Sequence, residues 1–195
     1  SIPPHVLPGR TVALLHFGRS GTGLMHSLID NHPEISTVPS FYLGGYFNGG
    51  IWEELVAGNP DELPERFADM FSTLFDATSL KPTPGAHQDG LRKMGFKEGM
   101  TAVGDNRDEI LMVDRTLFCM QARHLMKDFE AIDAGLFLRI AHAAYDHATD
   151  PQTNKQTLFY HIHNPGTLTS FNFISQTPDA RLMMMIREQV QSCES

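Results

Sequence analysis

Residues 11–23 of the chain are TVALLHFGRSGTG, and this stretch decides the fold. Its first half, up to Phe17, is a short apolar run with little polarity on either face, which is typical of a buried strand in a parallel sheet. Small residues from Gly18 to Gly23 interrupt the run, and residues 22–31 then follow a helical pattern. The core face expected for that helix consists of Leu24, Leu28 and Ile29. The stretch therefore predicts a strand, a glycine loop and a helix.

The glycine loop has the composition of an anion site. Small residues let successive backbone N–H groups converge, and the start of the following helix adds partial positive charge, a combination that binds phosphate or sulfate. Gly18 and Gly23 have the spacing of half a Walker loop, but Leu24 and Met25 stand where that loop has Lys and Ser or Thr. This disfavours ATP or GTP chemistry and favours a metal-free anion cradle with Arg19 as its cation. A plain tight turn between strand and helix is the structural alternative.

The rest of the chain alternates strand and helix patterns. Further strands are expected at residues 35–38, 100–103 and 157–163, and a buried one at 181–186. Helices are expected at residues 61–77, from a capping box at 106–109 to about 129, and at 130–148. A glycine- and aromatic-rich loop is expected at residues 41–52. Strands separated by helices predict an α/β domain with a mainly parallel sheet.

Composition narrows the class of protein. A chain of 195 residues fits one domain, and its net charge of −8 argues against nucleic-acid binding. No apolar run approaches the roughly 18 residues of a membrane span, and the first residues lack a signal-peptide pattern. Cys119 and Cys193 form no C-x-x-C pair, which fits a reducing compartment, so we expect a cytoplasmic protein. The first residue is not Met, and we expect residues 1–195 to be a fragment of a longer chain.

Two segments resemble a known family. Residues 16–34, HFGRSGTGLMHSLIDNHPE, resemble the 5′-phosphosulfate-binding loop and helix of sulfotransferases that use 3′-phosphoadenosine 5′-phosphosulfate (PAPS). Residues 178–187, PDARLMMMIR, are similar to the strand that leads into the family's 3′-phosphate site. In the family an Arg there is followed eight residues later by a Ser, as Arg187 is by Ser195. Glu188 and Gln189 depart from the family's pattern after that Arg.

The resemblance implies a fold, a reaction and a set of residues. The fold is a P-loop-like three-layer α/β sandwich around a mainly parallel sheet, here C-terminally incomplete because the family's last helix and closing loop would follow Ser195. The reaction is transfer of a sulfuryl group from PAPS, without a metal, to a hydroxyl or amine of a small-molecule or carbohydrate acceptor. Arg19 stands where many members carry a catalytic Lys, and Arg187 and Ser195 would hold the 3′-phosphate. The residues implied to cradle the 5′-phosphosulfate are Ser20, Gly21, Thr22 and Gly23.

His161 and His163 share one face of the expected strand at residues 157–163. An H-x-H pair can bind zinc, but no motif here supplies the further ligands, and a structural role for either ring is open. Cytosolic sulfotransferases carry a Lys-x-His near this place, whose His deprotonates the acceptor. By that resemblance His163 is the general base, and His161 is a catalytic neighbour contacting the sulfuryl oxygens. Asn164-Pro165 leaves open an alignment with members that carry Glu-Lys-x-Pro.

Two other classes of function fit the same loop. One is a nucleotide- or anion-binding P-loop module without catalysis, and the other is a small-molecule kinase or NTPase. Residues 104–108, GDNRD, either cap the next helix or reach an active site.

Overall fold

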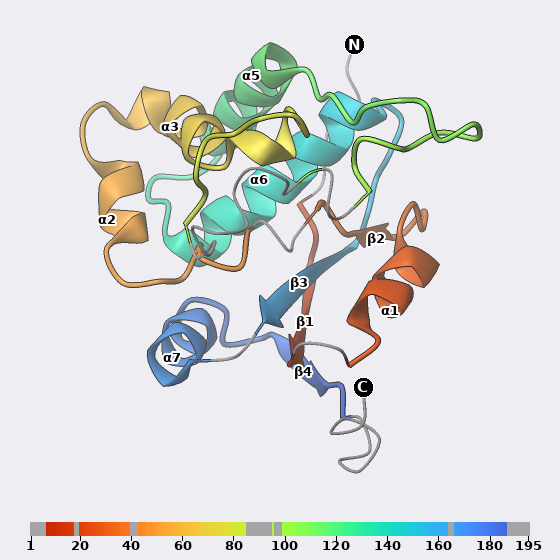
Figure 1. The fold of residues 1–195 in the computed structure, drawn as a ribbon. Helices are drawn as coiled ribbons and strands as arrows, with labels where there is room; N and C mark the ends of the chain where they lie inside the picture. The colour runs from red at the N-terminus through yellow and green to blue at the C-terminus, as the bar shows by residue number, and fades with distance from the viewer. Residues whose placement is uncertain are drawn as a thin grey trace.

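The structure is a computed structural model that describes residues 7–17, 20–39, 43–84, 95, 99–163 and 166–186. It is an α/β protein built on a sheet of four parallel strands in the order β2-β3-β1-β4 (Figure 1). The strands are β1 (Arg10–His16), β2 (Ile35–Ser36), β3 (Thr157–His163) and β4 (Arg181–Met184). The expected α/β class with a mainly parallel sheet is confirmed.

Eight helical segments have both ends within the described residues. They are α1 (Thr22–Ile29), α2 (Ile51–Val56), η2 (Pro60–Glu62), α3 (Leu63–Met70), η3 (Ser72–Leu74), α5 (Arg115–Met126), α6 (Ala134–Thr149) and α7 (Thr167–Gln176). None of the helices in this part of the chain is long and apolar enough to cross a bilayer.

The central pair of strands sets the geometry of the sheet. β1 and β3 pair over their full length, from Arg10 opposite Thr157 to His16 opposite His163. The middle residues of β3 are all buried and those of β1 are buried or half-buried, as expected for apolar runs between two layers of helices. Both strands therefore end at the same edge of the sheet.

Helices cover both faces of this pair. On one face His26 of α1 hydrogen-bonds His161, and on the other Phe173 of α7 stacks on Tyr160 with ring centroids 5.4 Å apart. Because successive strand residues point to opposite faces, these two contacts place α1 and α7 on opposite sides (Figure 1). The larger core lies on the α7 side of the sheet. The helix α6 also packs on this side, where its His142 forms a 2.8 Å hydrogen bond with Ser36 of β2.

Buried tyrosines illustrate how this core handles polar groups. The hydroxyls of Tyr46, Tyr145 and Tyr160 donate to the carbonyls of Ala134, Leu74 and Leu43, at 2.7–2.8 Å. Each hydroxyl thus keeps a partner after leaving water, which removes most of the cost of burying it.

Several helix boundaries differ from the prediction. The helix expected at 61–77 is broken into η2, α3 and η3, although the apolar residues along it, Phe67, Met70, Phe71, Leu74 and Phe75, are buried or half-buried. The capping box at 106–109 is wrong, because α5 begins at Arg115 and its cap is Asp114, whose carboxylate accepts from the Leu117 N–H at 2.9 Å. The helix expected from 130 begins at Ala134, where Asp133 plays the same role.

The strand expected at 100–103 is also wrong. These residues form turns, and Val103 makes only an isolated antiparallel bridge with Glu109. Residues 104–108 between the bridge partners are exposed, with Gly104 at φ +82° and Arg107 at φ +55°. They form a tight surface turn and do not cap the next helix.

Two apolar faces expected to be buried are exposed. β4 forms as predicted at the start of residues 181–186, but Leu182, Met183 and Met184 are 50%, 43% and 58% exposed. The reason is that β4 is an edge strand: β1 is its only neighbour in the described sheet, and its other edge has no strand beside it. Leu24 and Leu28 are 68% and 74% exposed and only Ile29 is half-buried, so the predicted core face of α1 is wrong at two of its three residues. The helix instead turns His26 toward the sheet.

The contact between α6 and the end of α7 yields a stability prediction. A methyl group on Gly135 would overlap the backbone carbonyl of Gln176, which cannot move without shifting α7. We expect Gly135→Ala to lower the free energy of unfolding by about 1–3 kcal/mol in urea denaturation. Gly49→Ala is the control, since its methyl would lie 4.0 Å from the Leu168 side chain, an ordinary contact. Equal denaturation midpoints for the two variants would contradict the packing described.

Candidate functional site

The helix that follows β1 begins at a glycine, which has no side chain to cap the first turn. Gly21, the N-cap of α1, has φ +82°, a left-handed conformation that favours glycine. The first turn of α1 contains no acidic residue and no side-chain cap. The hydroxyl of Ser20 does not fill this role, because it donates back to the Phe17 carbonyl at 2.7 Å. Among the described residues no side chain thus accepts from the first N–H groups of α1, which carry the positive end of the helix dipole.

The four predicted cradle residues differ in exposure. Gly21 and Gly23 are exposed, Ser20 is half-buried and Thr22 is buried. A Cβ at Gly21 or Gly23 would meet nothing within 4 Å, so the space beside the helix start is open among the described residues. Three further predicted residues, Arg19, Arg187 and Ser195, lie outside the described residues, and their roles stay predictions.

Four histidines meet beside this helix start. His16 ends β1, His161 and His163 lie at the end of β3, and His26 comes from α1. His161 is the centre: its Nε2 lies 2.9 Å from Nδ1 of His26, and its Nδ1 lies 3.3 Å from Nε2 of His16. The rings of His16 and His163 stack, with centroids 4.9 Å apart and planes inclined by 24°. The histidine cluster, as we call these four residues, occupies the α1 side of the sheet.

Burial keeps the inner rings of the histidine cluster neutral. His161 is fully buried, and its pKa falls to about 3, first through desolvation and then through His26, His16 and His163. Burial and His163 lower the pKa of His16 to about 4. The pKa of His26 is also lowered by burial, against an opposing effect of Asp30. A neutral imidazole donates at one nitrogen and accepts at the other, so His161 can bridge His26 and His16 in a single hydrogen-bonded chain.

Sequence reasoning found half of this cluster. His161 and His163 were identified by their spacing on one strand, and the structure confirms that they share its face. His16 and His26 were missed, although His16 stands at the last position of the first strand. His16 joins the cluster through the strand register, which pairs it with His163, and His26 joins it through the packing of α1 on the sheet. Neither relation can be read from a short window of sequence. Within the residues that the structure describes, no group of three or more His, Cys, Asp or Glu side chains is placed to hold a metal ion.

A cavity of about 530 Å³ adjoins the histidine cluster. It runs along α1 and faces α6 and the segment around residues 100–111. His26 belongs both to this cavity and to the cluster. The other polar side chains that line it are Ser27, Asp30, Asn31, Thr37, Tyr145, Asp146, Thr149 and Lys155.

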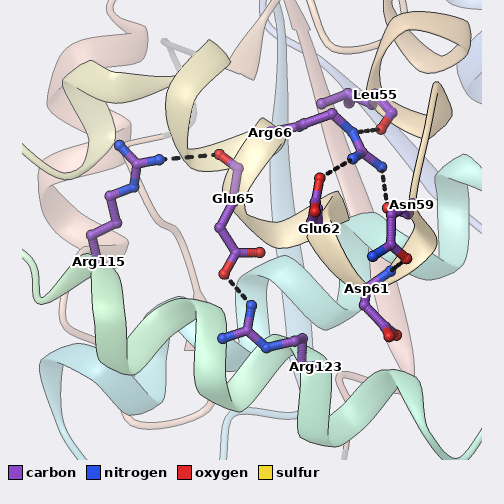
Figure 2. Close-up of polar contacts among 8 residues, drawn as sticks. All are labelled: Leu55, Asn59, Asp61, Glu62, Glu65, Arg66, Arg115 and Arg123. Carbon is purple, nitrogen blue, oxygen red and sulfur yellow. Dashed lines mark hydrogen bonds and ion pairs between the residues drawn. The ribbon is translucent and has the colours of Figure 1, made fainter.

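A larger cavity of about 820 Å³ lies between α3 and α5, but its arginines serve the fold. Arg66 donates to the carbonyls of Leu55 and Asn59 at 2.6 and 2.8 Å and lies 3.6 Å from Glu62 (Figure 2). Arg123 of α5 pairs with Glu65 of α3. These contacts hold α2, α3 and α5 together and engage both guanidinium groups, so we do not place the anion site there.

Comparisons of the chain with protein-family models, curated proteins and solved structures found no match.

The neutral histidines make stability depend on pH. In the unfolded chain each histidine has a pKa near 6.5, whereas in the fold His16 and His161 have values of about 4 and 3. Between pH 6.5 and these folded-state values, the unfolded chain binds more protons than the folded protein. The free energy of unfolding therefore falls as the pH drops below 6.5, by up to about 1.4 kcal/mol per pH unit for each ring.

Urea denaturation from pH 7.5 to pH 4.5 measures this loss. His161→Phe retains a ring but cannot titrate. Unfolding of this variant should therefore take up about one proton fewer, so that its free energy of unfolding depends less steeply on pH. A free energy of unfolding that stays constant from pH 7 to pH 4.5 in the parent chain would refute buried, neutral rings.

Proposed function

We propose that this chain is a domain of a PAPS-dependent sulfotransferase with a P-loop-like fold. It would transfer a sulfuryl group to a hydroxyl or amine of a small-molecule or carbohydrate acceptor, without a metal, in the cytoplasm. The observation that carries the proposal is the uncapped start of α1, which directly follows the central strand β1 and lies beside the histidine cluster. Crevices at the carboxyl ends of parallel strands are where such sheets bind ligands.

The residues present suit the phosphosulfate group. The left-handed Gly21 and the absence of acid in the first turn favour an anion at the N–H groups of residues 21–23. The proposal assigns Arg19 as the cation of this cradle and Arg187 and Ser195 as the 3′-phosphate contacts. PAPS would supply an activated sulfuryl group on a phosphate that is already a good leaving group. Positive charge and N–H donors are then what the protein must add.

His163 is assigned as the general base. It is exposed at the last position of β3 and stacks on His16 at the last position of β1. An exposed imidazole can accept the hydroxyl proton of an acceptor at a ring nitrogen. His161 has no exposed surface, so in this proposal it acts through its neighbours and orients His16 and His26 rather than contacting the sulfuryl oxygens.

The same helix start also supports a non-catalytic nucleotide- or anion-binding module. The two functions predict the same binding and differ in chemistry, so transfer of labelled sulfate from PAPS to an acceptor separates them.

Binding should not require a metal. Leu24 and Met25 follow the loop, and neither can ligate Mg²⁺ or hold a γ-phosphate. We expect calorimetry with adenosine 3′,5′-bisphosphate in EDTA to show binding, and added Mg²⁺ to leave the affinity unchanged within a factor of about two. ATP with Mg²⁺ is the control ligand and should not bind more tightly. A strict Mg²⁺ requirement would sink the proposal and favour an NTPase.

Removing the proposed base should impair turnover and spare nucleotide binding. We expect His163→Ala to lower kcat by about 10²–10⁴ and to leave the affinity for adenosine 3′,5′-bisphosphate nearly unchanged. His124→Ala is the matched control, because His124 is an exposed histidine on α5 that lines the other cavity. If both variants turn over PAPS at the parent rate, His163 is not the base.

A further inference from the structure

The cavity of about 530 Å³ beside α1 has the size of a small-molecule site. It starts at Gly23, in the proposed anion cradle, and extends past the end of α1 to Asp30 and Asn31. At 1.5 Å per residue these ends are roughly 10 Å apart. A ligand in the cavity could therefore reach the cradle at one end and contact Asp30 at the other.

Apolar atoms make up most of the surface that lines the cavity. Val38 and Met100 are buried, and Val103 and Leu111 are half-buried. Tyr145 adds its ring but not its hydroxyl, which is already donated to the Leu74 carbonyl at 2.8 Å. The cavity thus suits a ligand with an apolar body.

The buried charges in the cavity compensate each other. The Lys155 ammonium lies 3.1 Å from the Asp146 carboxylate, and both side chains are largely buried. Burial raises the pKa of Asp146 while Lys155 lowers it, which is the pattern of an ion pair that remains together. This pair leaves no net charge deep in the site.

The remaining charge is the carboxylate of Asp30 at the rim. Thr37 donates its hydroxyl to Asp30 Oδ1 at 2.9 Å, which fixes the side chain against the cavity wall. Among the described residues Asp30 forms no ion pair with a Lys or Arg. Since burial lowers the pKa of His26 and keeps its ring neutral at pH 7, the described residues give the cavity one net negative charge, at Asp30.

We propose that this cavity binds the acceptor, and that the acceptor is a small molecule with an apolar body and a protonated amine. The amine lies at Asp30, and the opposite end of the molecule points toward Gly23 and His26. The role of acceptor rests on the proposed sulfotransferase function, whereas selective binding of the amine does not.

Three probes of similar size test the charge preference: 2-phenylethylamine, 2-phenylethanol and phenylacetate. They share a ring and a short arm, and they end in a cation, a neutral hydroxyl and an anion. NMR titration at pH 7 and low salt, with the methyl signal of the cavity residue Met100 as the reporter, gives each affinity. We expect the amine to bind at least about tenfold more tightly than phenylacetate, with the alcohol between them, and the preference to shrink in high salt.

Asp30→Asn identifies the anchor, because the amide oxygen retains an acceptor for Thr37 and only the charge is lost. We expect this variant to bind the amine and the alcohol equally. The control variant is Asp61→Asn, which removes a carboxylate from the other cavity and should keep the full preference for the amine. Equal binding of all three probes by the parent chain, or a preference that survives Asp30→Asn, would overturn the inference.

A parallel titration with adenosine 3′,5′-bisphosphate separates the two proposals. Nucleotide binding without an amine preference overturns the cavity inference alone. An amine preference that depends on Asp30, without nucleotide binding, overturns the proposed sulfotransferase function and retains the cavity as an amine site.

Discussion

The parallel pairing of β1 with β3 is the constraint on which the rest of the structure depends. Its register sets His16 opposite His163 and ends both strands at the edge from which the loop to α1 leaves. A slip of one residue would turn every side chain of a strand to the other face, exchanging His161 with the apolar Tyr160 and Ile162. The large core on the α7 side therefore fixes the position of the histidines on the α1 side.

Burying imidazoles in this position costs free energy, because a polar ring without a partner loses its hydrogen bonds to water. The histidine cluster offsets this cost internally, since His161 meets one imidazole at each of its nitrogens. Such a network is sensitive to protonation, because a charged ring can no longer accept the bond that its neighbour donates. The cluster also joins the proposed anion cradle to the cavity beside α1 through His26. The proposed base His163 and the proposed acceptor site thus both depend on the contacts among the four histidines of the cluster.

The sequence predicts the parts of this arrangement that are local. The apolar run of β1, the glycine loop, and the alternation that puts His161 and His163 on one face all appear in short windows. The meeting of His16, His26 and His161 could not be predicted, because it depends on pairing between strands about 145 residues apart. The exposure of β4 was missed because an apolar run indicates a strand that can be buried, but does not tell whether other elements cover it. The helix α7 was missed because TLTSFNFISQ is rich in residues with weak helix propensity, and packing of Phe173 on Tyr160 stabilises it.

The location of the bound nucleotide tests the central claim most directly. Backbone amide signals of isotope-labelled protein can be followed while adenosine 3′,5′-bisphosphate is added in EDTA. The account predicts the largest shifts at Gly21, Thr22 and Gly23, followed by the ring nitrogens of the histidine cluster. Shifts confined to the cavity lined by Arg66 and Arg123, with the amides of residues 21–23 unchanged, would contradict an anion site at the start of α1.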